Sequence, residues 1–257
     1  MMAHLPDRRK FFARLLAGAG AMALAGCDKL SHSETFTKIL SAAETLSHNA
    51  HRLLSTRKSM AQEFSEADLS PSFRSNGTSS PNSPDYHAMA KNGFADWTLE
   101  VGGLVEKPLK FNLAQIQQMP SRTQITRHDC VEGWSAIGKW KGTPLHEFLS
   151  LVKPKPEARF VVFYCADPMK ADGTNFYYES IDMDDAYHAQ TILAYQLNDE
   201  NLPIKNGAPI RLRVERMLGY KQAKYLTRIE LVESFDHIAG GKGGYWEDTG
   251  YEWYAGI

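Results

Sequence analysis

The chain has few cysteines and almost no net charge, and both features exclude some classes of function. Only 3 cysteines occur among 257 residues, and no two of them form a Cys-x-x-Cys pair. A Cys-x-x-Cys-His haem attachment site is therefore excluded from this chain, and thiol–disulfide exchange is disfavoured. The net charge is −1 at pH 7, so we expect no general attraction to nucleic acid or to an anionic membrane.

Long apolar runs are also missing beyond the N-terminus. Past that region the sequence contains no apolar stretch of roughly 18 residues, the length needed to cross a bilayer. We therefore expect the mature chain not to span a membrane. Its length suits one large domain or two small ones with an ample apolar core.

The N-terminus carries the signature of an export signal. The twin-arginine pattern at 7–12 is followed by an apolar run from Leu15 to Ala25, and Cys27 closes a lipoprotein cleavage box. We expect residues 1–26 to be a twin-arginine and lipoprotein signal segment. The folded protein would reach the periplasm, where Cys27 would be lipidated and would hold it at the membrane. The alternative is an ordinary cleaved signal in which Cys27 has no role.

The remainder divides into an N-terminal helical segment, 27–64, and a domain, 65–257. Apolar residues recur at helical spacing over 34–58. Residues 65–93 are rich in Ser, Pro, Asn and Gly and show no period. Beyond them, short strands near 97–101 and 160–164 are mixed with helices expected at 112–119, 143–151 and 180–197. The pattern predicts an α+β domain without regular alternation.

The segment 126–140 has the highest density of chemically active side chains. A cysteine thiolate is a soft ligand that suits a redox metal, and Cys130 has Arg127 and His128 nearby, which would favour the thiolate. We expect four neighbours to shape a substrate pocket: His128, Asp129, Glu132 and Trp134. Two other interpretations of Cys130 remain open. It could be a buried small residue, or it could form a disulfide with Cys165.

Residues 205–228 are strongly basic. Glu215 is the single acid among seven cations, which are Lys205, Arg211, Arg213, Arg216, Lys221, Lys224 and Arg228. Apolar residues alternate with Arg211 and Arg213, so a strand could bury one face and show cations on the other. The turn 219–221 could meet an anion through backbone N–H groups and a lysine. A solvated basic strand face is the alternative.

The C-terminal segment from Gly240 to Ile257 is dense in aromatic residues. They are Tyr245, Trp246, Tyr251, Trp253 and Tyr254. Such a cluster either closes the domain or lines the mouth of a pocket, and the sequence leaves both open.

Several of these motifs together resemble the catalytic domain of the sulfite oxidase family of molybdopterin enzymes. The resemblance is strongest to exported bacterial members without haem, such as the catalytic subunits of periplasmic methionine sulfoxide reductase-like molybdoenzymes. It rests on the order and spacing of the segments at 130–135, 193–198, 206–211, 219–226 and 228–229. It covers the chain from about Ser70 to Val232 and implies a sulfite oxidase-type α+β fold.

The resemblance also implies roles for individual residues. Cys130 would be the protein ligand to molybdenum in a molybdenum–molybdopterin cofactor. The residues that would bind the pterin and its phosphate are Asn76, Asp167, Asn206, Arg211, Gly219, Tyr220, Lys221 and Lys224. The physics agrees, because a buried phosphate needs cations and backbone donors.

The implied function is oxygen-atom or electron transfer on a small sulfur or N-/S-oxide substrate, with its direction left open. The arginine-rich sulfite-binding residues that follow the cysteine in sulfite oxidases are absent, because Val131 to Trp134 stand there. The immunoglobulin-like dimerisation domain is absent too. An electron partner is needed, and we expect a membrane cytochrome b or a quinone-linked subunit.

A non-enzymatic alternative is an exported lipoprotein with a basic anion-binding groove and a Cys130–Cys165 disulfide. The twin-arginine pair distinguishes the two, since a disulfide-linked binding protein would not normally need export in the folded state.

Overall fold

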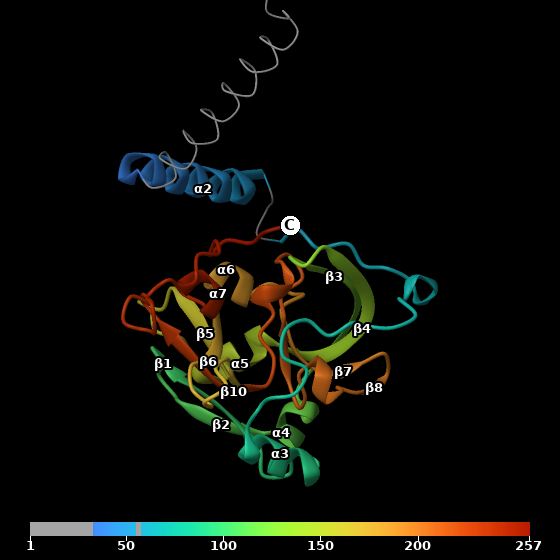
Figure 1. Ribbon diagram of the computed structural model, residues 1–257. Coiled ribbons are helices and arrows are strands. Elements are labelled where there is room, and N and C mark those ends of the chain that lie inside the picture. The colour runs from blue at the N-terminus through green and yellow to red at the C-terminus, as the bar shows by residue number, and fades with distance from the viewer. Residues whose placement is uncertain (1–32, 55–57) are drawn as a thin grey trace, which may run out of the picture. The chain divides into compact units, whose positions relative to one another are not determined.

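The computed structural model describes residues 33–54 and 58–257 (Figure 1). The chain divides into two compact units, Met1–Leu54 and Ser55–Ile257, which are described separately. The signal predicted at 1–26 and the lipidation predicted at Cys27 lie outside the described residues. Both stay predictions.

In the first unit the described residues form a single helix, α2, over Glu34–Leu54. This confirms the helix expected from the apolar periodicity, and residues 55–57 of the predicted range lie outside the described residues. Several large apolar side chains on it are exposed, namely Ile39, Leu46 and Leu53. Among the helices that the structure describes, none has the length and apolar character needed to cross a membrane.

The second unit contains two five-stranded sheets in the part of the chain that is described. The first sheet has the order β2-β1-β10-β5-β6, with β1 parallel to β10 and the other pairs antiparallel. Its strands are β1 (Thr98–Gly103), β2 (Leu109–Asn112), β5 (Phe160–Pro168), β6 (Phe176–Asp182) and β10 (Leu226–Val232). The strands β5 and β6 deliver polar side chains to the candidate site.

The second sheet has the order β3-β4-β7-β8, with β9 also paired to β7. Its strands are β3 (Arg122–Cys130), β4 (Trp134–Pro144), β7 (Ile192–Leu197), β8 (Glu200–Asn201) and β9 (Arg211–Arg213). Figure 1 shows β3 and β4 side by side as a long curved hairpin. Cys130 pairs with Trp134 at the end of this hairpin, so the strand pairing places the cysteine beside the turn.

Short helices connect the strands. They are η1 (Glu66–Asp68), α3 (Pro84–Lys91), α4 (Leu113–Gln118), α5 (Leu145–Val152), α6 (Met183–Ala186), η2 (Ile204–Asn206), η3 (Gly219–Lys221) and α7 (Tyr245–Asp248). The helices expected at 112–119 and 143–151 are confirmed as α4 and α5. Asn112 caps α4, because its side-chain oxygen accepts a hydrogen bond of 2.8 Å from the Gln115 backbone N–H.

The helix predicted over 180–197 is wrong. Residues 176–182 form β6, α6 contains 4 residues, and residues 192–197 form β7. Asp182 does cap α6 by accepting from the Asp185 backbone N–H, but the acidic cluster supports only that one turn. The apolar run from Ile192 is buried between β4 and β9, and tertiary pairing overrides its helical propensity.

The domain also begins earlier than the predicted boundary at residue 65. The second compact unit starts at Ser55. Glu63 forms an isolated bridge with Thr126, and the Phe64 N–H donates to the Ile125 carbonyl at 2.8 Å. The residues before 65 therefore add to the outer edge of β3.

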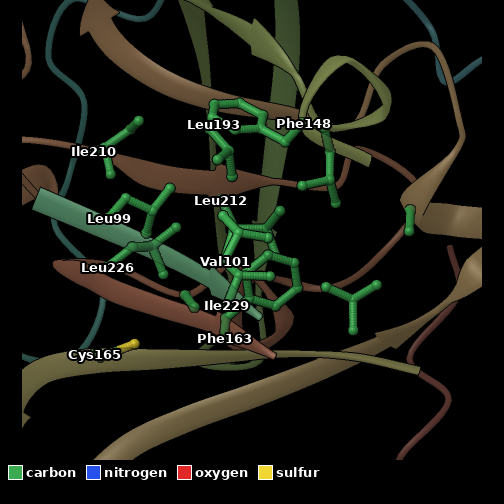
Figure 2. Close-up of a cluster of buried hydrophobic side chains, with 14 of the residues drawn as sticks. Leu99, Val101, Phe148, Phe163, Cys165, Leu193, Ile210, Leu212, Leu226 and Ile229 are labelled. Atoms are coloured by element: carbon green, nitrogen blue, oxygen red, sulfur yellow. The ribbon is translucent and has the colours of Figure 1, made fainter. Parts of the chain in front are cut away.

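The main core cluster takes side chains from both sheets and from α5. Figure 2 shows Leu99 and Val101 of β1 close to Phe163 of β5 and Ile229 of β10, with Phe148 of α5 above them. These side chains are fully or almost fully buried. Complete burial of an aromatic or aliphatic side chain contributes roughly 1.5–3 kcal/mol, so this cluster holds the two sheets in the arrangement on which the site depends.

We predict that Phe163→Ala lowers the free energy of unfolding by about 3–5 kcal/mol, because it removes a buried ring and leaves a cavity. Urea denaturation of the cofactor-free protein measures this loss. Leu151→Ala is the control, since Leu151 is 46% exposed and its truncation should change stability by only about 0.5 kcal/mol. Equal losses in the two variants would contradict the core assignment.

Candidate functional site

Cys130 lies in the wall of a cavity of about 730 Å³, a volume that includes space open to solvent. The wall draws on segments far apart in the sequence. It consists of Asn76, Gly77, Thr78, Cys130, Val131, Glu132, Asp167, Met169, Tyr177, Gly219, Tyr220, Gln222, Lys224, Trp246 and Tyr251. Seven residues to which the sequence analysis assigned a role at the cofactor or substrate are among them: Asn76, Cys130, Glu132, Asp167, Gly219, Tyr220 and Lys224.

The β3–β4 turn presents the Cys130 thiol to this cavity. Gly133 has φ 81°, a left-handed conformation that glycine adopts without strain, and its N–H donates to the Cys130 carbonyl at 3.0 Å. The turn therefore closes immediately after the cysteine. The thiol remains partly accessible, as a metal ligand in a cavity wall must be.

The expectation that Arg127 and His128 favour the thiolate form of Cys130 is wrong. Arg127 pairs with Asp129 at 3.0 Å. His128 is fully buried, and burial together with Arg213 holds its pKa well below the usual range, so its ring is neutral. Burial raises the pKa of Cys130. A bound metal, which deprotonates a coordinating thiol outright, is the agent that can overcome this rise.

Several buried polar atoms around the cavity have no hydrogen-bond partner among the described residues. They are Asn76 Oδ1, Asp167 Oδ1 and Gln222 Oε1 in the wall. Both amide atoms of Asn206, a residue that does not line the cavity, also lack partners. Leaving such an atom unsatisfied costs roughly 1–3 kcal/mol, and native proteins keep few of them. The wall therefore fits a polar group that offers donors and acceptors, as a pterin does.

Lys224 places a cation in the same wall. Its ammonium donates to the Asn76 carbonyl at 2.6 Å, to the Thr78 carbonyl, and at 3.3 Å to the Lys205 carbonyl. It forms no ion pair with any described carboxylate. Burial, reinforced by nearby Arg211, lowers its pKa to about 7, while Asp167 acts in the opposite direction. An anion in the cavity would relieve this cost and keep the lysine charged.

Arg211 is a second buried cation without a carboxylate partner in the described chain. Its guanidinium donates at 3.0 Å to the Asn206 carbonyl and at 3.0 Å to the Gln222 carbonyl. Burial and the neighbouring Arg213 lower its pKa to about 9. The alternative of a solvated basic strand face is therefore wrong, because both arginines of β9 are fully buried. Arg211 is not among the residues that line the cavity. Its buried charge without a carboxylate partner, unlike that of Lys221, favours an anion close to it.

Arg213, by contrast, is neutralised within the fold. It bonds Glu215 through two nitrogens, with Nε at 2.9 Å, and it contacts His128 Nδ1 at 3.0 Å. Its guanidinium also lies 4.3 Å from the Trp140 ring centroid. None of these partners lines the cavity, so the contacts of Arg213 are structural.

Lys221 does not direct its side chain into the cavity. Its ammonium bonds Glu179 Oε1 at 2.5 Å and Glu247 Oε1 at 2.6 Å, and all three side chains are buried. The Lys221 backbone N–H is also used, since it donates to the Leu218 carbonyl at 3.0 Å. The prediction that Lys221 contacts the cofactor phosphate is therefore not supported by its geometry. Gly219 and Tyr220 of the same turn do line the cavity.

Of the four residues expected to shape the substrate pocket, only Glu132 lines this cavity. His128 is buried behind Gly219, where a Cβ would lie 2.5 Å from His128 Nε2, so the turn needs glycine there. Asp129 lines a separate pocket. Trp134 covers His128 at 5.5 Å between ring centroids, and its indole N–H donates to Glu132 at 2.9 Å.

Cys165 lies on β5 and is buried, and both Cys130 and Cys165 are free thiols. The disulfide considered from the sequence is therefore absent in this structure. Asp167, two residues further along, presents its carboxyl to the cavity. Burial raises its pKa to about 7, opposed by Lys224, so this acid can gain or lose a proton near neutral pH.

Sequence reasoning missed several residues of the wall. Gln222, Met169 and Tyr177 carried no local signal, because they belong to loops and to a strand end that only the fold brings to the cavity. Trp246 and Tyr251 belong to the aromatic tail, for which two roles were left open. The structure supports both the closing role and the pocket-lining role. The two rings line the cavity, and they also pack against each other with 5.3 Å between their centroids.

Comparison with known proteins identifies relatives over most of the chain. Residues 86–237 match the family described as the oxidoreductase molybdopterin binding domain. A provisionally named protein-methionine-sulfoxide reductase subunit, YedZ1, from Azospira oryzae is 35% identical over 252 residues, covering 98% of this chain and 88% of that protein. The protein-methionine-sulfoxide reductase catalytic subunit MsrP of Xanthomonas axonopodis pv. citri is 31% identical over 242 residues, covering 91% and 72%.

A solved structure, the sulfane dehydrogenase SoxCD from Paracoccus pantotrophus, is also similar. It matches 55% of this chain and 39% of that one, with 24% identity and a TM-score of 0.48.

We predict that Asp167 gives the cofactor-free protein a distinctive dependence of stability on pH. The folded pKa of Asp167 is raised to about 7, whereas an unfolded aspartate titrates near about 3.9. As pH rises between these values the unfolded chain releases the proton first, so the free energy of unfolding falls. Lys224, with its pKa lowered to about 7, affects stability mainly above that window.

The measurement is urea denaturation of the wild type and Asp167→Asn across this range. The variant cannot ionise, so its stability relative to the wild type should rise as pH increases towards about 7. Parallel pH profiles for the two proteins would contradict the raised pKa.

Proposed function

This chain belongs to the family of oxidoreductase molybdopterin binding domains, within the sulfite oxidase family, and from that premise we propose that it reduces a small S-oxide at a molybdenum atom held by Cys130. Its being a molybdopterin oxidoreductase follows from the family. The ligand, the substrate and the direction are our proposal. The direction is supported by the two relatives named as protein-methionine-sulfoxide reductases.

The observation that carries the proposal is the thiol of Cys130 in the wall of a cavity whose other polar groups lack partners. Thiolate is a soft donor of the kind that binds redox metals. The described residues contain no cluster of three or more His, Cys, Asp or Glu side chains able to hold a metal ion by themselves. Most of the ligands must therefore come from a cofactor, as a pterin dithiolene supplies them.

We propose that the cofactor is held by two groups of residues. Lys224 and Arg211, the buried cations without carboxylate partners, would bind its phosphate. Hydrogen bonds to the pterin would come from Asn76, Asp167, Asn206, Gly219, Tyr220 and Gln222. Asn76 links its own loop to the turn η3, since its side-chain amide donates to the Gly219 carbonyl at 3.3 Å. Lys221 is left out of this set because two glutamates occupy its ammonium.

When bound, the cofactor supplies two-electron redox chemistry at molybdenum. The overall reaction is R₂SO + 2 e⁻ + 2 H⁺ → R₂S + H₂O, in which the S–O bond breaks and the oxygen leaves as water. The chain itself must supply protons and exclude bulk water. Asp167, with a pKa of about 7, can hold a proton at its carboxyl in the cavity wall and release it near neutral pH.

The reaction consumes two electrons, and the sequence contains no Cys-x-x-Cys-His site for covalently attached haem. We propose a membrane cytochrome b or a quinone-linked subunit as the electron donor. The twin-arginine pattern and the cleavage box at Cys27 support a periplasmic protein held at the membrane, which would keep it beside such a donor.

The non-enzymatic alternative, a binding lipoprotein with a disulfide, is overturned. The chain belongs to a family of oxidoreductases, and the two cysteines in question are free. The exposed basic groove that this alternative requires is not formed by β9, since both arginines of that strand are buried.

We predict that Cys130→Ser abolishes sulfoxide reduction, because a serine hydroxyl is a much poorer donor to a redox metal than a thiolate. Activity is measured per molybdenum atom with dimethyl sulfoxide and an artificial electron carrier. Cys165→Ala is the matched control, since Cys165 is buried in β5, and it should retain turnover. Full activity in Cys130→Ser would refute the ligand assignment.

We further predict that Lys224→Met lowers cofactor occupancy by about 10- to 100-fold, since a charge-assisted bond contributes roughly 1.5–3 kcal/mol. Molybdenum and phosphate analysis of the dialysed protein measures the occupancy. Lys205→Met is the control, because Lys205 is an exposed cation of the neighbouring helix η2, and it should load normally. Circular dichroism checks that both variants fold. Equal loading would exclude Lys224 from the phosphate site.

A further inference from the structure

The C-terminal tail, residues 240–257, contributes to the cavity although it lies beyond the family match, which ends at residue 237. Trp246 and Tyr251 are both in the cavity wall. Tyr251 is 42% exposed, and Val131 and Glu132 of the β3–β4 turn are exposed in the same wall. The solvent-facing side of the cavity is therefore built partly by tail residues that lie beyond the family match.

The tail is joined to η3, the turn that also lines the cavity. The Tyr220 ring meets the Tyr251 ring edge to face at 5.3 Å, and its hydroxyl donates to the Glu252 carbonyl at 2.6 Å. The Leu218 N–H donates to the Ala255 carbonyl at 2.9 Å. These contacts bind the tail along the whole turn.

Trp246 and Tyr251 also hold each other. Their ring centroids are 5.3 Å apart with 31° between the planes, and the Tyr251 N–H donates to the Trp246 carbonyl at 3.0 Å. The two rings are thus packed together as one aromatic pair.

A buried clamp fixes α7, the helix that carries Trp246. Lys221 of η3 bonds Glu179 of β6 and Glu247 of α7 at 2.5 and 2.6 Å. Gly244 precedes α7, and a Cβ there would lie 2.0 Å from Glu247 Oε2. The close approach of the backbone to the carboxylate leaves room only for glycine.

The clamp contains two carboxyl groups and one ammonium. Burial, together with nearby Glu247, raises the pKa of Glu179 well above its usual range, against the opposing effect of Lys221. The raised pKa favours the protonated form of Glu179, which lowers the cost of burying two carboxyl groups beside one ammonium.

A second anchor holds the other end of α7. Asp248 accepts a hydrogen bond of 2.6 Å from the Tyr178 hydroxyl, and it accepts from the Gly240 and Lys242 backbone N–H groups at 2.9 and 3.1 Å. The tail is thus positioned from both sides, which a surface segment without a role in the site would not need.

We propose that the tail is the substrate-selecting wall of this cavity, in which Trp246 and Tyr251 determine specificity and the Lys221–Glu179–Glu247 clamp positions them. The proposal rests on the proposed function, since the substrate it selects is the sulfoxide reduced in the cavity. The two rings contact the organic substituents of the sulfoxide, because aromatic faces attract aryl groups and sulfur atoms. A sulfoxide with a large apolar substituent is therefore favoured over dimethyl sulfoxide.

The test compares methyl phenyl sulfoxide with dimethyl sulfoxide as substrates of the molybdenum-loaded enzyme. In Trp246→Ala and Tyr251→Ala the ratio of the two kcat/KM values should fall about tenfold, mainly through a higher KM for the aryl substrate. Tyr187→Ala is the control, since Tyr187 is 49% exposed and does not line the cavity; its ratio should match the wild type. An unchanged ratio in the two tail variants, with dimethyl sulfoxide still reduced, would overturn the proposal.

The clamp is tested by the selectivity of two Glu247 variants. Glu247→Ala removes the acceptor for Lys221 and should lower the same ratio. Glu247→Gln keeps an oxygen at that position and should restore it. A purely structural role would lower stability or total turnover in Glu247→Ala and leave the ratio of the two substrates unchanged.

Binding of unreactive sulfones separates this proposal from the proposed function. Calorimetric titration of the loaded enzyme with methyl phenyl sulfone and dimethyl sulfone needs no turnover. Loss of the aryl preference in the Trp246 and Tyr251 variants supports the tail proposal even if the wild type reduces no sulfoxide, an outcome that would refute only the proposed function. A preference that is absent in the wild type, or unchanged in both variants, overturns the tail proposal.

Discussion

The burial of two cations without carboxylate partners is the constraint on which the site depends. Lys224 and Arg211 form no ion pair with any described residue, and burial lowers the pKa of each. The protein satisfies them with backbone carbonyls, which supply dipoles but no negative charge. A bound phosphate would convert this unfavourable arrangement into charge-assisted hydrogen bonds. The fold therefore keeps a cost that only a ligand removes.

Local pattern was enough to single out the cysteine, because a soft thiol amid charged groups is informative in itself, and to predict the strand near 160–164. It was not enough to predict which residues next to Cys130 line the same cavity. Successive residues of a strand point to opposite faces, so Asp129 faces a different pocket from Cys130. Strict use of that alternation could have excluded Asp129. It could not have shown that His128, on the same face as Cys130, would be covered by Gly219.

The two lysines at 221 and 224 show where sequence reasoning ends. Both lie in one basic segment and both are buried. Lys221 is paired because β6 and α7, which are distant in the sequence, each bring a glutamate to it. Lys224 meets only carbonyls and hydroxyls. Charge composition predicts that cations are present, but only the tertiary fold decides which of them are left for a ligand. The strand at 192–197 was missed for the same reason.

The turn η3 connects the cofactor side of the cavity to its substrate side. Within three residues, Gly219 packs on His128 and accepts from Asn76, Tyr220 contacts the tail, and Lys221 enters the clamp. A turn shared in this way links the two sides, so a change in the tail reaches the cofactor cradle only if it displaces η3. The buried clamp of Lys221 and the two glutamates holds η3 in place. As long as the clamp is intact, the aromatic side chains of the tail can change without moving the residues that would hold the cofactor.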